Sequence, residues 1–215
     1  MNIAVLGTGG VGVAIGTKLI ELGHHVKMGS RTANNPKAVE WANAAGANAS
    51  AATFADANRF GEVIFNCTLG LGSIEALGAA GQAALKGKLV IDISNPLDFS
   101  KGMPPSLFVG NTDSLGEQIQ RAFPEAHIVK TLNTVAAPVM VNPAIIPGDH
   151  DIFVCGNDAG AKAQATDILK NWFGWNSVVD LGDLTAARAT EAWVPFWVRI
   201  MMTTGSPMHN IKVVR

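Results

Sequence analysis

Short apolar runs alternate with helical repeats along almost the whole chain. The first run, Asn2 to Leu6, has the unbroken apolar character of a strand buried in a parallel sheet. Apolar residues then recur at helical spacing, at Val11, Ile15, Leu19 and Leu22. Lys18 and Glu21 fall on the opposite side of this predicted helix. This opening therefore predicts a strand that passes directly into a helix.

The same alternation continues downstream. Further strands are predicted at His25 to Met28, Ala47 to Phe54, Glu62 to Thr68, Lys88 to Ser94, His127 to Thr131, Asp151 to Cys155 and Ser177 to Leu181. Helices are predicted over Pro36 to Ala45, Asp56 to Arg59, Gly70 to Leu85, Ala159 to Phe173 and Leu184 to Thr204. A further helix is predicted to end near Ala122, with Ser114 as its N-terminal cap. The stretch Ser100 to Thr112 contains several prolines and glycines and is expected to be an irregular loop.

Strands that alternate with helices in this way predict an α/β fold with a doubly wound, mostly parallel sheet of the Rossmann type. No repeat or linker divides the chain, so we expect one domain over residues 1–215. From about residue 150, the chain is expected to form a small C-terminal α/β lobe that completes the sheet and ends in a long helix. Ligands of such folds bind over the carboxyl ends of the strands, where the strand order reverses.

A glycine-rich turn joins the first predicted strand to the first helix. It comprises Gly7, Thr8, Gly9, Gly10, Val11 and Gly12. Glycines here allow a tight turn, close approach of the backbone to a pyrophosphate and close packing of helix on strand, while the helix N-terminus attracts the anion. The turn predicts a dinucleotide site, and the alternative is a glycine-rich turn without a ligand.

The end of the second predicted strand indicates which dinucleotide is bound. An NAD-binding protein places Asp or Glu here, on the ribose 2′-hydroxyl. This chain has Ser30, Arg31 and Thr32 instead, and Lys37 follows a few residues later. A guanidinium and two hydroxyl groups suit a 2′-phosphate, so the cofactor is predicted to be NADP. A solvated turn arginine is the alternative.

Other predicted strands also end in small or polar residues. Those expected to line the crevice are Thr68, Leu69, Asn95, Pro96, Asn133 and Ala137. Thr68 and the Asn95-Pro96 pair stand where the nicotinamide half of the cofactor is expected. Each polar residue alone also suits a turn or a cap. Their joint occurrence at successive strand ends predicts one binding crevice.

Composition and charge exclude several other classes of protein. A net charge of −1 and a pI near 6.5 give no electrostatic reason to expect binding to nucleic acid or to an acidic membrane surface. Cys67 and Cys155 lie in apolar runs and are expected to be buried thiols in a reducing compartment. The N-terminal glycines argue against a signal peptide, and Pro195 and Arg199 interrupt the most apolar later stretch. We expect a cytoplasmic protein that does not span a membrane.

The sequence shows neither an arrangement of residues suited to acid–base catalysis nor the spacing of metal ligands. No catalytic residue and no metal ligand is therefore assigned. Its histidines are His24, His25, His127, His150 and His209. They fall at turns or strand starts, and only His209 is kept as a candidate pocket residue. This pattern favours a reaction whose cofactors carry the chemistry, such as hydride transfer between two redox cofactors. The apolar C-terminal helix suits either core packing or a homodimer contact.

Taken together, these motifs resemble the F420-dependent NADP reductase family over nearly the full length of the chain. The segments that carry the resemblance are Gly7 to Gly12, Leu22 to Val26, Gly29 to Arg31, Ser94 to Leu97, Val129 to Thr134, Val154 to Asp158 and Glu191 to Lys212. The resemblance implies that Thr8 to Val11 hold the pyrophosphate and that Ser30 and Arg31 hold the 2′-phosphate. It also implies that the nicotinamide is bordered by Thr68, Leu69, Pro96 and Ala137.

The resemblance further implies that the hydride partner is F420 or a related flavin such as FMN. Two other functions stay open at this point. One is NADPH-dependent reduction of a small carbonyl or imine, which would require a proton donor in the crevice. The other is an NADP-binding regulatory module without turnover.

Overall fold

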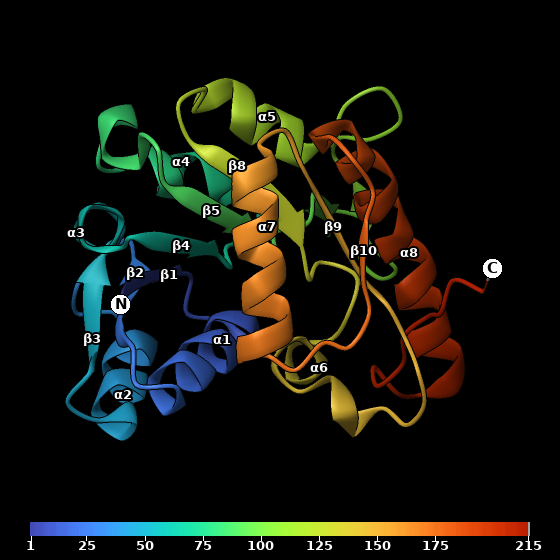
Figure 1. Cartoon of the computed structure of the whole chain (residues 1–215), viewed down its shortest axis with the longest axis horizontal. Coiled ribbons are helices and arrows are strands. Elements are labelled where there is room, and N and C mark those ends of the chain that lie inside the picture. Colours follow the sequence, from blue (N-terminus) through green and yellow to red (C-terminus); the bar gives the residue numbers. More distant parts are fainter. Residues whose placement is uncertain (215) are drawn as a thin grey trace.

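The centre of the molecule is an eight-stranded sheet in the order β10-β9-β8-β5-β4-β1-β2-β3. The computed structural model describes residues 1–214, so Arg215, the last residue of the predicted domain, lies outside the described residues (Figure 1). The strands of this sheet are β1 (Asn2–Leu6), β2 (His25–Ser30), β3 (Ala49–Thr53), β4 (Val63–Asn66), β5 (Leu89–Asp92), β8 (His127–Thr131), β9 (Ile152–Gly156) and β10 (Val178–Asp180). The predicted α/β class with a doubly wound, mostly parallel sheet is confirmed.

Helices cover both faces of this sheet. They are α1 (Gly10–Glu21), α2 (Pro36–Ala45), α3 (Phe54–Phe60), α4 (Ser73–Gly78), α5 (Leu115–Ala122), α6 (Ala137–Val141), α7 (Ala159–Asp167) and α8 (Ala187–Thr204). One apolar core packs α1, α2, α6 and α7 against one face. A second core packs α3, α4, α5 and the start of α8 against the other (Figure 1).

Helix starts follow the local capping signals. The side chain of Asn35 accepts hydrogen bonds from the backbone N–H groups of Lys37 and Ala38, so α2 begins at Pro36 as predicted. The hydroxyl of Ser114 accepts from the N–H of Glu117 at 3.1 Å and starts α5. Such caps satisfy donors that the first helical turn leaves without partners, which is why these two boundaries are readable from the sequence.

Five segments differ from the prediction. Strand β9 pairs antiparallel with β8, the single exception among the strand pairs of the described sheet. The stretch expected to be irregular contains β7 (Ser106–Leu107), which forms a small hairpin with β6 (Leu97–Asp98). Helix α3 is longer than the predicted single turn, and α6 had no predicted counterpart. Helix α7 is shorter than predicted because a π-helical turn, Ile168–Trp172, completes that segment.

The topology places the candidate site. The strand order reverses between β1 and β4, and a crevice opens at such a point over the carboxyl ends of parallel strands. The chain leaves these ends toward α1, toward the loop after β4 and toward the loops after β5 and β8. In the part of the chain that the structure describes, no helix combines the length and apolarity needed to cross a bilayer.

Candidate functional site

The glycine turn has two kinds of glycine. Gly7 has a φ of 112°, and a side chain there would come within 2.6 Å of the carbonyl oxygen of Cys67. A side chain at Gly12 would collide with the carbonyl oxygen of Gly7. Gly9 and Gly10, by contrast, are exposed and have nothing within 4 Å of the position a Cβ would take. The first two glycines therefore close the turn, while the other two leave free space beside the backbone.

That space faces the N-terminus of α1. No side chain caps this helix at Gly9, and no acidic residue lies in its first turn. The N–H of Val13 bonds to the carbonyl of Gly9, so the N–H groups of Gly10, Val11 and Gly12 precede the first intrahelical bond. Unpaired N–H groups and the positive end of the helix dipole suit a phosphate anion, so the turn fits the pyrophosphate predicted for it. Thr8 is half-buried in the same turn.

At the end of β2, the predicted 2′-phosphate residues divide into one structural residue and three exposed residues. Ser30 is buried, and its hydroxyl donates to the carbonyl of Thr32 at 2.6 Å. Arg31, Thr32 and Lys37 are exposed, and within residues 1–214 neither Arg31 nor Lys37 forms an ion pair. The hydroxyl proton of Ser30 thus holds the turn, and the donors available to an anion come from the exposed side chains of Arg31, Thr32 and Lys37.

The loop after β4 combines a fixed threonine with exposed apolar side chains. The hydroxyl of Thr68 donates to Oδ1 of Asn66 at 2.7 Å and lies 2.9 Å from the hydroxyl of Ser73. Leu69 and Leu71 are 76% and 75% exposed. Leucines as exposed as these offer apolar surface to a flat ring system, as expected for a residue beside the nicotinamide or its acceptor.

The loops after β5 and β8 are joined by a reciprocal amide pair. Nδ2 of Asn95 donates to the carbonyl of Asn133 at 2.9 Å, and Nδ2 of Asn133 donates to Oδ1 of Asn95 at 2.9 Å. Nδ2 of Asn133 also donates to the carbonyl of Thr190 in α8 at 3.0 Å. Pro96 is buried beside this pair and Ala137 begins α6. Asn95 and Asn133 therefore bring the loops after β5 and β8 into contact.

Two buried oxygens in the loop after β8 have no hydrogen-bond donor among residues 1–214. They are Oδ1 of Asn133 and Oγ1 of Thr134, in side chains that are 4% and 3% exposed. The preceding Leu132 has a φ of 62°, a left-handed conformation that is unfavourable for a leucine. A strained residue next to unpaired polar atoms is typical of a ligand-binding loop.

The structure also reveals a buried ionic cluster that the sequence analysis missed. Nζ of Lys130 lies 2.8 Å from Oδ2 of Asp92 and 2.8 Å from Oε1 of Glu191, and all three side chains are 0–1% exposed. We call Asp92, Lys130 and Glu191 the buried triad. The available signal was a charged residue inside the apolar runs Leu89 to Ile93 and Ile128 to Thr131, but nothing in the sequence pairs either with Glu191.

The electrostatics of the buried triad keep Lys130 charged. Burial alone lowers the pKa of Lys130, but the carboxylates of Asp92 and Glu191 outweigh it and raise the pKa above its ordinary value. The three N–H bonds of the ammonium match three oxygens, the third being the carbonyl of Ser94. Lys130 therefore has no proton available for a molecule in the crevice.

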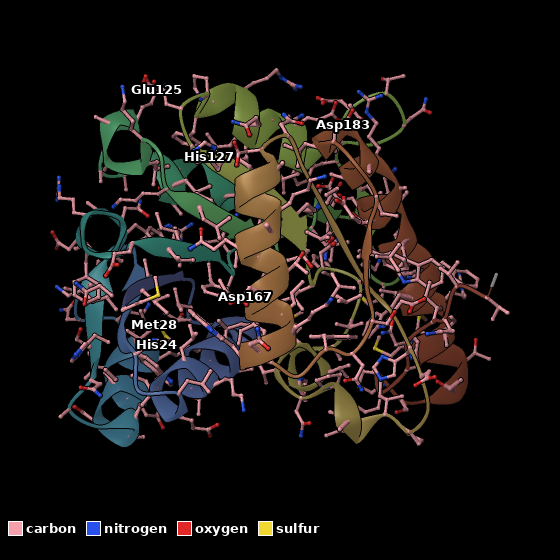
Figure 2. All side chains as sticks on the ribbon, viewed as in Figure 1. His24, Met28, Glu125, His127, Asp167 and Asp183 are labelled. Carbon is pink, nitrogen blue, oxygen red and sulfur yellow. The ribbon has the colours of Figure 1, made fainter. Side chains whose placement is uncertain are left out.

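His24, His25 and His127 lie at the amino ends of their strands, whereas His150 precedes the antiparallel β9 and therefore lies on the carboxyl-end side of β8. His25 and His127 are the first residues of β2 and β8, and the ring of His24 lies 4.4 Å from that of Trp172 (Figure 2). His150 bonds to Pro143 and Asn210. His209, the candidate pocket residue, stacks on Trp197 at 4.9 Å. Within residues 1–214, no group of His, Cys, Asp and Glu could hold a metal ion.

Both cysteines have raised thiol pKa values. Burial raises the pKa of Cys155 to about 12, and it also raises the pKa of Cys67, which lies beside Asp92. Cys155 is buried as predicted, whereas Cys67, the residue directly after β4, is only half-buried. Neither thiol is a nucleophile at neutral pH.

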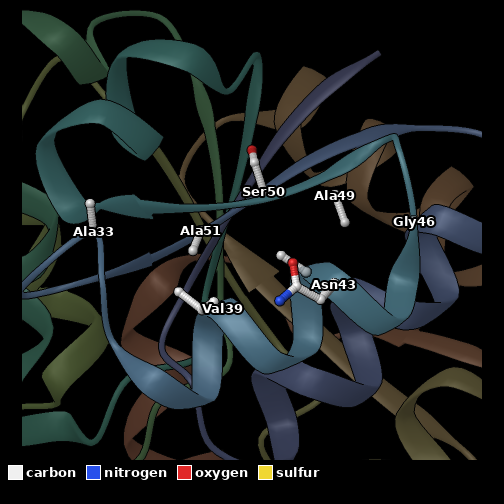
Figure 3. A pocket seen from close by; sticks show the side chains of 8 residues that line it. Ala33, Val39, Asn43, Gly46, Ala49, Ser50 and Ala51 are labelled. Atoms are coloured by element: carbon white, nitrogen blue, oxygen red, sulfur yellow. The ribbon is translucent and has the colours of Figure 1, made fainter.

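Two surface hollows of the molecule lie away from the predicted site. One of about 500 Å³ lies between α2 and β3 and is lined by Val39, Asn43 and Ser50, among others (Figure 3). Another of about 480 Å³ is lined by Arg121, His127 and Asp158. Neither contains a residue of the predicted cofactor site, and neither lies at the carboxyl ends of the central strands. An extended dinucleotide needs an open crevice along the strand ends rather than an enclosed cavity.

A doubly wound sheet with a glycine turn at its switch point defines a Rossmann-type protein of the dinucleotide-binding class. The family model for "NADP oxidoreductase coenzyme F420-dependent" matches residues 2–96. A solved structure of a candidate F420-dependent NADP reductase from Arthrobacter sp. FB24 is 47% identical, with a TM-score of 0.94 and complete coverage of both chains. The chain belongs to the F420-dependent NADP oxidoreductase family.

Curated relatives agree at lower identity. The F420-dependent NADP reductase of Methanocaldococcus jannaschii is 32% identical over 130 residues, which is 60% of this chain and 57% of that enzyme. The chain thus matches little more than half the length of this relative. The F420-dependent NADP reductase of Methanothermobacter marburgensis is 26% identical over 209 residues, which is 93% of this chain and 92% of that enzyme.

Proposed function

We propose that this chain transfers hydride between NADP(H) and coenzyme F420 or a related flavin such as FMN. The observation that carries the proposal is the exposed Arg31, which directly follows β2 at the strand end where an NAD enzyme would have a carboxylate. The N–H of Gly7 donates to the carbonyl of Gly29, so this strand end adjoins the turn whose Gly9 and Gly10 leave room for a pyrophosphate, and the exposed Lys37 follows in the first turn of α2. This combination suits a dinucleotide with a third phosphate.

Residues of the chain have separate tasks in binding. The turn Gly7 to Gly12 would hold the pyrophosphate through backbone N–H groups, with Thr8 at its edge. Arg31 and Lys37 would neutralise the 2′-phosphate, with Thr32 beside them and the buried Ser30 fixing the turn. The nicotinamide half would lie against Thr68, Leu69, Asn95, Pro96, Asn133 and Ala137. We propose that the chain acts as one domain, in which residues from about 150 onward complete the sheet.

The contribution of the protein to catalysis is positioning. When bound, NADPH supplies a hydride, and the acceptor brings its own electrophilic ring. The exposed Leu69 and Leu71 would exclude water from the ring edges, and the Asn95–Asn133 pair would fix the two loops on either side. The protons of the buried Lys130 all have acceptors within the protein, which agrees with a reaction in which the two cofactors carry the chemistry.

The direct test is anaerobic mixing with NADPH and three acceptors: F420, FMN and a small imine. The proposal expects rapid loss of NADPH absorbance with F420 and slower loss with FMN. Oxidation only by the imine would instead assign a reductase of small substrates. Tight NADPH binding without oxidation by any of the three would indicate a regulatory module.

We also propose that α8 forms a homodimer contact. Phe196 and Met202 on this helix are 55% and 48% exposed, and Met208 of the following tail is 40% exposed. Apolar side chains of this size on one terminal element suit association of two copies. Light scattering should give twice the chain mass, and Phe196→Glu should give the monomer mass; a monomeric wild type would contradict this proposal.

A further inference from the structure

The buried triad belongs to a single row of polar side chains across the sheet. In the strand register, Asn66 of β4 pairs with Asp92 of β5, and Asp92 pairs with Lys130 of β8. Paired residues of neighbouring strands point to the same face. Glu191 of α8 completes the row, and its carboxylate also accepts from the N–H groups of Leu115 and Gly116 at 2.8 and 3.0 Å.

Stability does not explain this arrangement. Burying three charged groups carries a large desolvation penalty, and well-packed apolar residues of similar volume usually stabilise a protein equally well. The row is nevertheless fully satisfied, because the N-terminus of α5 offsets the excess negative charge of two carboxylates against one ammonium. A buried ionic arrangement at the strand ends indicates that the loops after these strands must be held in a defined position.

What the row holds is the backbone of two site loops. Asp92 accepts from the N–H and the hydroxyl of Ser94 at 3.2 and 2.6 Å, and Lys130 donates to the carbonyl of Ser94. Every polar group of Ser94 is therefore engaged, immediately before Asn95-Pro96. On the other side, Nδ2 of Asn66 donates to Asp92 at 2.8 Å, while Oδ1 of Asn66 accepts from Thr68.

The row is unsuited to moving protons. Asn66 stands between Asp92 and Thr68, and a carboxamide does not exchange a proton in the way a carboxyl group does. Lys130 is fully buried and its three protons already have acceptors. The buried triad can therefore affect the crevice by fixing the positions of Thr68 and Ser94, and not by proton transfer.

We propose that Asp92, Lys130 and Glu191 are positioning residues that hold the Thr68 loop and the Ser94–Pro96 loop in place for the nicotinamide half of the cofactor and the hydride acceptor. This inference rests on the proposed function. It separates the site into two parts: an adenine half fixed by the glycine turn and Arg31, and a nicotinamide half fixed by the buried triad.

Two variants of different severity test this division. Asp92→Asn keeps the shape of the side chain but removes its charge, and Ser94→Ala removes one donor while leaving the triad intact. Glu125→Gln, in an exposed pair with Lys86, is the matched control. For each folded variant, calorimetry measures affinity for NADPH and for 2′,5′-ADP, which lacks the nicotinamide half. Stopped-flow absorbance then measures single-turnover hydride transfer from NADPH to F420, far below the unfolding temperature.

The expected result is a split between the two halves of the site. Asp92→Asn should transfer hydride at least tenfold more slowly, Ser94→Ala should lose less, and affinity for 2′,5′-ADP should stay within twofold in all variants. The preference of the protein for NADPH over 2′,5′-ADP should fall in Asp92→Asn. Equal losses of both affinities, or an unchanged rate in both variants, would overturn the inference. If Asp92→Asn does not fold, the Ser94→Ala rate decides.

Failure of the proposed function gives a different result. A wild-type protein that binds NADPH but transfers hydride to neither F420 nor FMN refutes the proposed reaction. The binding comparison still decides the positioning inference in that case, because it requires no turnover. Wild-type protein that binds neither NADPH nor 2′,5′-ADP would refute both.

Discussion

A side chain at Gly12 would collide with the carbonyl oxygen of Gly7, because the first turn of α1 packs directly against the end of β1. Gly9, two residues after Gly7, has no atom within 4 Å of the position its Cβ would take. Its φ of −80° and ψ of −179° lie in a region that any residue adopts. Gly12 is therefore needed for the packing of α1 against β1, whereas Gly9 is needed for the approach of a ligand.

Substitution at these glycines should separate stability from binding. Gly12→Val should destabilise the fold by about 1–3 kcal/mol through overpacking. Gly9→Val should leave the free energy of unfolding within about 0.5 kcal/mol of wild type yet abolish NADPH binding by occupying the pyrophosphate space. Urea unfolding and fluorescence titration measure the two effects. Retained affinity in Gly9→Val would mean that the turn is not the phosphate site.

Arg31→Ala should weaken NADP(H) binding selectively. Loss of a charge-assisted contact to the 2′-phosphate is expected to cost about 1.5–3 kcal/mol, or roughly ten- to over a hundredfold in Kd. Affinity for NAD(H), which lacks that phosphate, should hardly change. Calorimetric titration with both cofactors measures the difference. Arg59→Ala, on the exposed surface of α3 where Arg59 pairs with Asp56, is the control and should change neither affinity. Equal losses for both cofactors in Arg31→Ala would remove the 2′-phosphate assignment.

Removal of the ammonium from the buried triad should destabilise the protein strongly. Lys130→Met leaves the carboxylates of Asp92 and Glu191 buried without their cation, and loss of one partner of a buried pair typically costs about 3–5 kcal/mol. The exposed pair of Lys86 and Glu125 offers the comparison, because Lys86→Met should cost less than about 1 kcal/mol. Urea unfolding at neutral pH measures both variants, and similar values for the two would contradict the assigned burial of the triad.

Asp113 should make the stability depend on pH in the acid range. Hydrogen bonds from Arg121 lower the pKa of Asp113 to about 2, compared with about 3.9 in an unfolded chain. A depressed pKa stabilises the fold above the unfolded value, and the contribution disappears as the pH falls from about 4 to about 2. Because both side chains are partly exposed, solvent screening limits it to about 1 kcal/mol or less.

Asp113→Asn isolates this contribution. The variant should be less stable than wild type at pH 6, and the two should converge as the pH approaches about 2. Urea unfolding across this range measures the difference. A difference between the two proteins that does not change with pH would contradict the role of the charged pair.

Local signals predicted much of the fold. Strand β1, helix α2 and the cap at Ser114 could be read because each depends on residues adjacent in sequence. The antiparallel direction of β9 could not, because an apolar run such as Ile152 to Cys155 looks the same in either direction. The hairpin of β6 and β7 has only two residues in each strand, too few to show a period.

The two halves of the candidate site were predictable to different degrees. The adenine half is encoded in one continuous stretch, so the glycine turn and Arg31 mark it directly. The buried triad depends on strand register, which places Asp92 and Lys130, distant in sequence, side by side. Its third member, Glu191, reaches the row only through the packing of α8 against α5, which no local pattern in the sequence encodes.

Isotope labelling follows the proposed hydride transfer from NADPH to F420. NADPH deuterated at both nicotinamide C4 positions is mixed with F420 and the protein in ordinary water, and the reduced F420 is weighed by mass spectrometry. Each reduced F420 should carry one deuterium, because hydride passes to a ring carbon without exchange with solvent. Reduced F420 without deuterium, or NADPH that binds and is never oxidised by F420, would contradict it.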